Sequence, residues 1–226
     1  MIVAVILLAG CYNYQKNENL FNNFENFQWQ DEFLMGERVR NLSLIPGIDD
    51  PAILVNGHPI TRRQIETDNI FANRFAEVEP LNTVIDSANR LIRENISLQV
   101  AKHLELQPSQ EAINGSMESI RALIEHESGR HISFIEGLGM TIDEYLAMRE
   151  SNAYNNFLIA VLKEYFRDAN FSEIRAAADI RMEETNEASH RAFLNVVSEF
   201  FERYVDELVE QADIEILDPE IRELLQ

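Results

Sequence analysis

The residues of this sequence that could perform chemistry include a pair of histidines close together in the chain. His126 and Glu127, followed by His131, superficially suggest the helix of a zinc protease. That motif needs two histidines four residues apart, so that both face one ion. Here the spacing is five residues, and Gly129 lies between the histidines. We therefore expect no metal site and no metal cofactor.

Paired carboxylates are a second candidate for chemistry. The pairs are Glu183 with Glu184, Asp206 with Glu207, and Glu118 with Glu125. Acid–base catalysis needs two carboxylates in different environments, usually within a cleft, whereas these fall on polar helix faces. The sequence also has no Gly-x-Ser-x-Gly elbow and no glycine-rich phosphate loop. We expect no catalytic residue and no cofactor, and an enzyme remains a third alternative.

The charge balance limits the classes of partner. The chain has 226 residues, of which 46% are hydrophobic and 26% charged, as in ordinary globular proteins. Lys and Arg total 19 against 39 Asp and Glu, so the formal net charge is −20. Such a surface repels phosphate backbones, and we expect no nucleic-acid binding. Anionic lipid is repelled too, so membrane attachment would need a covalent anchor.

The single cysteine, Cys11, follows an unbroken apolar run over residues 2–10. The run is too short to span a bilayer but has the length of a signal-peptide core. Residues 8–11, Leu-Ala-Gly-Cys, resemble the bacterial lipobox, although no Lys or Arg precedes the run. The resemblance implies a signal peptide over residues 1–10 and a lipid on Cys11, anchoring the protein on the extracytoplasmic face of a bacterial cell membrane. The alternative is an ordinary apolar N-terminus with a chance cysteine.

Residues 11–50 are predicted to form a tether rich in Asn and Phe. Its aromatic residues have the spacing of one helical edge: Phe21, Phe24, Phe27, Trp29 and Phe33. This edge either docks on the protein's own core or forms an exposed patch for a partner. Pro46-Gly47 and Asp49-Asp50-Pro51 mark a loop, so we expect the folded domain to cover residues 51–226.

Two short strands are expected in an otherwise helical domain. Residues 52–56 are apolar and partly β-branched, and Asn56-Gly57 predicts a tight hairpin turn. The alternating run at about residues 213–217 predicts the second strand. Because an isolated strand is unstable, we expect these two segments to pair and bring the ends of the domain together. The predicted class is therefore mainly α.

The helices are predicted from capping signals and apolar spacing. Thr61 with Gln64, and Thr141 with Glu144, have the capping-box pattern that opens a helix. Further helices are expected from about residue 81 to 104, from Pro108, and around 134–138, the last closed by Gly137 or Gly139. Residues 172–211 are predicted to form one continuous helix. No glycine follows Gly139, which excludes a turn-rich β domain there.

This order of motifs resembles the N-terminal chaperone domain of the SurA and PrsA family of extracytoplasmic folding factors. Residues 55–61 match its opening pattern of valine-asparagine-glycine, two residues, then isoleucine-threonine. The other matching segments are residues 90–106, 108–113, 134–146 and 212–216. The family prefers glycine where this chain has Glu105. The resemblance covers about residues 52–217 and leaves no space for the family's parvulin-type prolyl isomerase domain.

The resemblance implies a chaperone that holds unfolded or secreted polypeptides without ATP and without isomerase activity. Apolar residues near the glycine hinge are the candidates for client binding, namely Phe134, Leu138, Met140, Tyr145 and Met148. The alternative interpretation of these five residues is that they belong to the core. A different class of function, an accessory or scaffold lipoprotein that binds one dedicated partner, also remains open, as does the oligomeric state.

Overall fold

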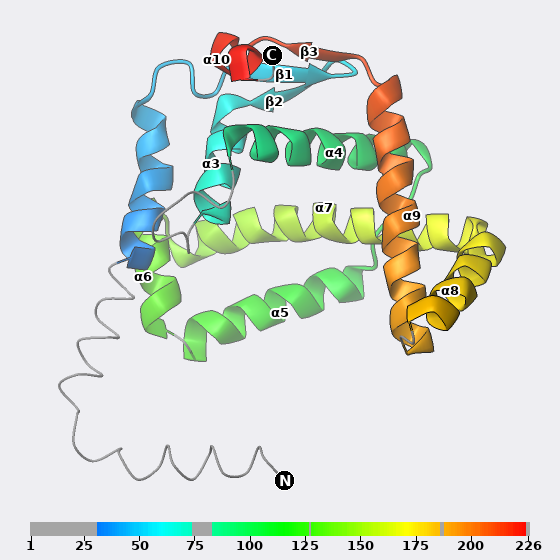
Figure 1. The fold of residues 1–226 in the computed structure, drawn as a ribbon. Helices are drawn as coiled ribbons and strands as arrows, with labels where there is room; N and C mark the ends of the chain where they lie inside the picture. Colours follow the sequence, from blue (N-terminus) through cyan, green and yellow to red (C-terminus); the bar gives the residue numbers. More distant parts are fainter. Residues whose placement is uncertain (1–30, 74–82, 127, 186–187, 225–226) are drawn as a thin grey trace.

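The computed structural model describes residues 31–73, 83–126, 128–185 and 188–224, which form a set of helices closed by one small sheet (Figure 1). The mainly α class is confirmed. The predicted signal segment 1–10, Cys11 and the aromatic residues before residue 31 lie outside the described residues.

The strands are β1 (Pro51–Val55), β2 (His58–Thr61) and β3 (Ile214–Ile216). The helices that follow the first strands are α3 (Arg62–Ala72), α4 (Val84–His103), α5 (Gln110–His126), α6 (Ser128–Leu138), α7 (Ile142–Ala169), α8 (Phe171–Thr185), α9 (Ser189–Gln211) and α10 (Pro219–Leu224).

The sheet joins the beginning and the end of the domain. Its strand order is β2-β1-β3, with both pairs antiparallel. Asn56 and Gly57 connect β1 to β2 with φ angles of 52° and 77°, the left-handed values that a two-residue type I′ turn requires. Val55 of β1 lies opposite Ile214 of β3. The Asp213 amide donates to the Asn56 side-chain oxygen at 2.9 Å. The predicted pairing of the first and last strands is therefore confirmed.

Three helices lie one below another beneath the sheet: α4 next to it, α7 across the middle and α5 beyond (Figure 1). The capping boxes predicted at Thr61 and Thr141 are both present, and Thr83 caps α4 in the same way. Aliphatic side chains fill the space between the sheet and α4, where their burial removes apolar area from water. They are Ala52, Ile53, Val55, Ile60, Ile65, Ala88, Ile92, Ile96 and Ile221.

The continuous helix predicted over residues 172–211 is wrong, because the chain folds back between α8 and α9 (Figure 1). Antiparallel packing of the two helices buries Ile174 and Ala178 of α8 against Val196 and Val197 of α9. A single straight helix would leave these four side chains in water, at a cost of about 1.5–3 kcal/mol for each large one. The segment between Thr185 and Ser189 contains neither glycine nor proline. We therefore attribute the end of α8 to the burial of side chains between the two helices.

The tether predicted over residues 11–50 does not extend through residues 31–50, which are folded onto the domain. Residues 31–41 form a helix, followed by the 3-10 helix η1 (Leu42–Leu44). Met35, Leu42 and Ile48 are buried in one cluster with residues of α3, α5, α6 and α7. The loop signals at residues 46–51 mark a turn inside the domain, so the predicted boundary at residue 50 is too late.

Two glycines allow the 31–41 helix and α6 to touch backbone to backbone. A Cβ atom on Gly137 would overlap the carbonyl oxygen of Phe33, and one on Gly36 would overlap that of Phe134. The same Cβ on Gly36 would lie 2.8 Å from the amide nitrogen of Leu138. Both glycines are buried. This close approach places the 31–41 helix over the face of α6 that carries the predicted client-binding residues.

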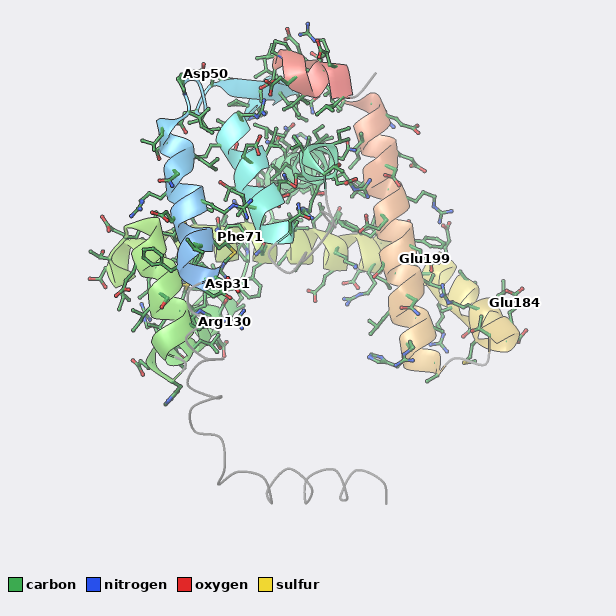
Figure 2. The ribbon with its side chains drawn as sticks, turned by 60° about the vertical axis from the view of Figure 1, so that its left-hand side comes forward. Asp31, Asp50, Phe71, Arg130, Glu184 and Glu199 are labelled. Carbon is green, nitrogen blue, oxygen red and sulfur yellow. The ribbon has the colours of Figure 1, made fainter. Side chains whose placement is uncertain are left out.

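Arginines connect elements that are distant in the sequence. The pairs are Arg62 with Asp218, Arg90 with Asp68, Arg93 with Glu202 and Asp206, Arg130 with Glu32, and Arg181 with Glu199. Figure 2 labels Arg130 on α6 and Glu199 on α9, on opposite sides of the molecule. Because acidic residues exceed basic residues by 20, this use of arginines leaves the remaining surface strongly negative.

Candidate functional site

The five predicted client-binding residues do not form an open surface. Phe134, Leu138 and Tyr145 are each only 7% exposed and belong to the core cluster that also contains Met35. Met148 is partly buried against the same cluster, and Met140 alone is exposed. The prediction is therefore corrected for the three buried residues, for which the alternative interpretation as core residues holds.

Aromatic contacts explain why these side chains are fixed. The Phe134 ring lies edge-on to Tyr145 with centroids 6.2 Å apart and edge-on to Phe71 at 5.8 Å. Phe71, which Figure 2 labels at the end of α3, is 36% exposed and forms the outer limit of the cluster. Edge-to-face pairs of this kind add about 0.5–1.5 kcal/mol beyond the burial of area.

An open aromatic groove lies at the other side of the molecule, where α7, α8 and α9 meet. Its volume is about 630 Å³. The lining residues are Leu162, Tyr165, Phe166, Ala169, Asn170, Glu173, Phe200, Arg203, Tyr204 and Glu207. The corner that creates the groove is Asn170, whose side-chain amide donates to the Phe166 carbonyl at 2.8 Å and ends α7. α8 begins at the next residue and returns toward α9.

The floor of the groove is rigid because its rings pack on one another. Phe166 stacks on Tyr204 with centroids 4.8 Å apart and an interplanar angle of 27°, and it meets Phe201 edge-on at 5.9 Å. Leu162 and Phe201 are buried beneath these rings. Aromatic side chains held in this way present apolar area with little loss of conformational entropy when a ligand binds.

The edge of the groove combines exposed rings with charged groups. Tyr165 of α7 is 50% exposed. Burial, and secondly the nearby Tyr165, raise the pKa of Tyr204 above its ordinary value, so its hydroxyl keeps its proton at neutral pH. Glu173 and Glu207 are exposed at the edge, and the Arg203 guanidinium lies 4.4 Å from the Phe200 ring centroid. The groove therefore offers apolar faces, hydroxyl groups, two carboxylates and one guanidinium to a ligand.

The two histidines considered for metal binding belong to different helices. His126 is the last residue of α5, and His131 lies within α6. Among the residues that the structure describes, no group of three or more His, Cys, Asp or Glu side chains could hold a metal ion. Within those same ranges no helix is long and apolar enough to cross a membrane.

Comparisons with models of protein families, with curated proteins and with solved structures found no match. The resemblance to the SurA and PrsA family therefore continues to depend on the motifs in the sequence. Glu105 has a left-handed φ of 55°, a conformation that glycine adopts without steric cost.

The position of the groove could not be predicted from the sequence, although the sequence assigns several of its residues to apolar helix faces. Tyr165 and Tyr204 both belong to the apolar stripes of predicted helices. Their meeting depends on the fold-back between α8 and α9, which a continuous helix would prevent. The available signal was the presence of aromatic residues on both stripes, among them Tyr165, Phe200 and Tyr204.

Proposed function

We propose that this protein holds non-native polypeptide segments in the aromatic groove between α7, α8 and α9, without ATP and without chemical turnover. The observation that carries the proposal is an open groove with a rigid aromatic floor and a half-exposed Tyr165 at its edge. An unfolded segment can place one apolar side chain on these rings and remain otherwise in water. Affinity for each segment is weak, because the held chain loses conformational entropy.

The sequence motifs support the same function. The segments that resemble the SurA and PrsA chaperone domain include the hairpin at Asn56 and the strand that pairs with it. A strongly negative surface also keeps the protein soluble while it holds sticky clients. We propose that Cys11 carries the lipid that keeps the protein at the extracytoplasmic face of the membrane. Replacement of Cys11 by serine, with loss of radiolabelled palmitate, is the test of that part.

The decisive experiment measures aggregation of chemically unfolded proteins by light scattering. The purified full chain at modest molar excess should slow aggregation of several unrelated substrates. Tyr165→Ser should weaken this effect by about threefold to tenfold, the value of one exposed aromatic contact. Tyr154→Ser is the matched control, because Tyr154 is 40% exposed on the same helix outside the groove. An unchanged effect in the Tyr165 variant would contradict the site.

The alternative of a dedicated partner has a separate readout. The sequence feature that suggests such a partner is the aromatic edge from Phe21 to Phe33. Only Phe33 of this edge lies within the described residues, and its side chain is half-buried. Capture of one stoichiometric protein by the tagged full chain would favour a scaffold, whereas a broad range of secreted proteins favours holding of clients. Acceleration of prolyl isomerisation in a standard peptide assay would overturn the proposal that the protein has no turnover.

A further inference from the structure

Carboxylates border the aromatic groove on two of its three helices. Glu173 comes from the first turn of α8, and Glu207 comes from α9. Both side chains are exposed, and within the described residues neither forms an ion pair or hydrogen bond with another side chain. Their negative charges are therefore available to a ligand that lies in the groove.

One ring beside these carboxylates already accepts a cation from the protein itself. The Arg203 guanidinium lies 4.4 Å from the centroid of Phe200, and both residues line the groove. Such contacts gain from the negative face of an aromatic ring. The same corner of the molecule thus combines apolar faces, faces that attract cations and two unpaired carboxylates.

We infer that the groove selects client segments in which an apolar or aromatic residue is flanked by Lys or Arg. This inference rests on the proposed function and names the chemical class of the client. The apolar side chain lies on Phe166 and Tyr204, while the flanking cation lies near Glu173 or Glu207. Segments that carry Asp or Glu at the same positions are repelled by the edge and by a chain whose net charge is −20.

The size of the preference follows from the exposure of the carboxylates. Each ion pair at an exposed edge is weak and is screened by salt. Two such pairs together predict about fivefold tighter binding of a cationic segment than of a neutral one at low salt. The preference should disappear at about 0.5 M salt, because screening then acts over a few ångströms.

Fluorescence anisotropy with three labelled peptides tests the inference on the full chain. The peptides share two Phe residues and differ only in the flanking positions, which are Lys, Ser or Glu. The Lys peptide should bind about fivefold tighter than the Ser peptide, and the Glu peptide should bind more weakly than both. Thermal unfolding of the full chain and of each variant described below shows whether the protein is folded.

Variants at the edge should act with opposite signs. Glu173→Gln combined with Glu207→Gln should remove the preference for Lys over Ser, so that the variant binds the two peptides equally well. Arg203→Gln should raise affinity for the Lys peptide about twofold, because it removes a like charge from the groove. Glu118→Gln combined with Glu125→Gln, two exposed positions on α5, is the matched control and should change nothing.

The outcomes separate this inference from the proposed function. Equal binding of the Lys and Glu peptides, with aggregation still suppressed, overturns the preference and leaves the holding function in place. Absence of suppression for every substrate overturns both. A concentration-dependent dimer in sedimentation velocity that Tyr165→Ser dissolves would show that a second copy of the chain fills the groove, and it would also overturn the inference.

Discussion

Substitution of Gly137 by alanine tests whether the 31–41 helix is truly held against α6. The new Cβ would overlap the Phe33 carbonyl oxygen and lie 3.0 Å from the Glu37 amide nitrogen. Both atoms belong to the backbone, so no side chain can rotate to make room. The two helices must separate by about 1 Å, which loses a quarter to a half of the dispersion energy of the contacts between them.

The expected loss of stability follows from two opposing terms. Overpacking lowers the free energy of unfolding by about 1–3 kcal/mol. We expect the upper value, about 3 kcal/mol, because the new Cβ meets backbone atoms that cannot rotate away. Alanine in place of glycine in a helix returns about 1 kcal/mol. The net destabilisation is about 2 kcal/mol, or a fall of about 4–8 °C in the melting temperature for a chain of this length.

Gly115→Ala is the matched control, because Gly115 lies on α5 with no heavy atom within 4 Å of the new Cβ. It should gain about 1 kcal/mol from helix propensity alone. The measurement is urea and thermal unfolding followed by circular dichroism at 222 nm. If Gly137→Ala were as stable as Gly115→Ala, the close contact between the two helices would be refuted.

Two further predictions concern the end of α4 and the connection to α10. Glu105→Gly should stabilise the protein by up to about 1 kcal/mol, since the left-handed φ of 55° strains any residue with a Cβ; an unchanged or lower midpoint in urea would contradict this. At Asp218, burial acts to raise the pKa, but hydrogen bonds from Arg62 and from backbone amides outweigh burial and hold the pKa below its usual range. A carboxyl with a depressed folded pKa contributes stability that is present above its unfolded pKa and lost as the pH falls through the folded one. Asp218→Asn should therefore cost about 1–2 kcal/mol at pH 7, with the two unfolding curves converging below about pH 4; a constant difference down to pH 3 would refute the assignment.

The sequence predicted those features that short segments determine by themselves. Asn56-Gly57 specifies a hairpin turn wherever it occurs between strands, and Thr61 and Thr141 cap helices through residues only three positions away. The pairing of β1 with β3 followed from a simple requirement, because each strand needed a partner and few candidates existed. Local chemistry was sufficient in all these cases.

Features that depend on distant contacts were missed. Gly36 and Gly137 are 101 positions apart, and neither sequence context shows that they meet, so the sequence predicts a tether where the helix packs on α6. The fold-back between α8 and α9 has no glycine or proline, and the burial of Ile174 and Ala178 against α9 favours it. The groove could not be predicted for the same reason, because α7, α8 and α9 line it together only when the chain folds back between α8 and α9.

The closure of the sheet has a consequence for synthesis. Asn56 and Asp213 are hydrogen-bonded although they are 157 positions apart. A chain that emerges from the ribosome amino end first can form α3 to α7 early, but β1 lacks its neighbour β3 until residues 214–216 have appeared. Contacts of such long sequence separation are slow to form, because the entropy of closing the loop is lost before any pairing is gained. Truncation of the chain before Ile214 should thus leave helical but incompletely assembled molecules, vulnerable to proteases at the exposed edge of β1.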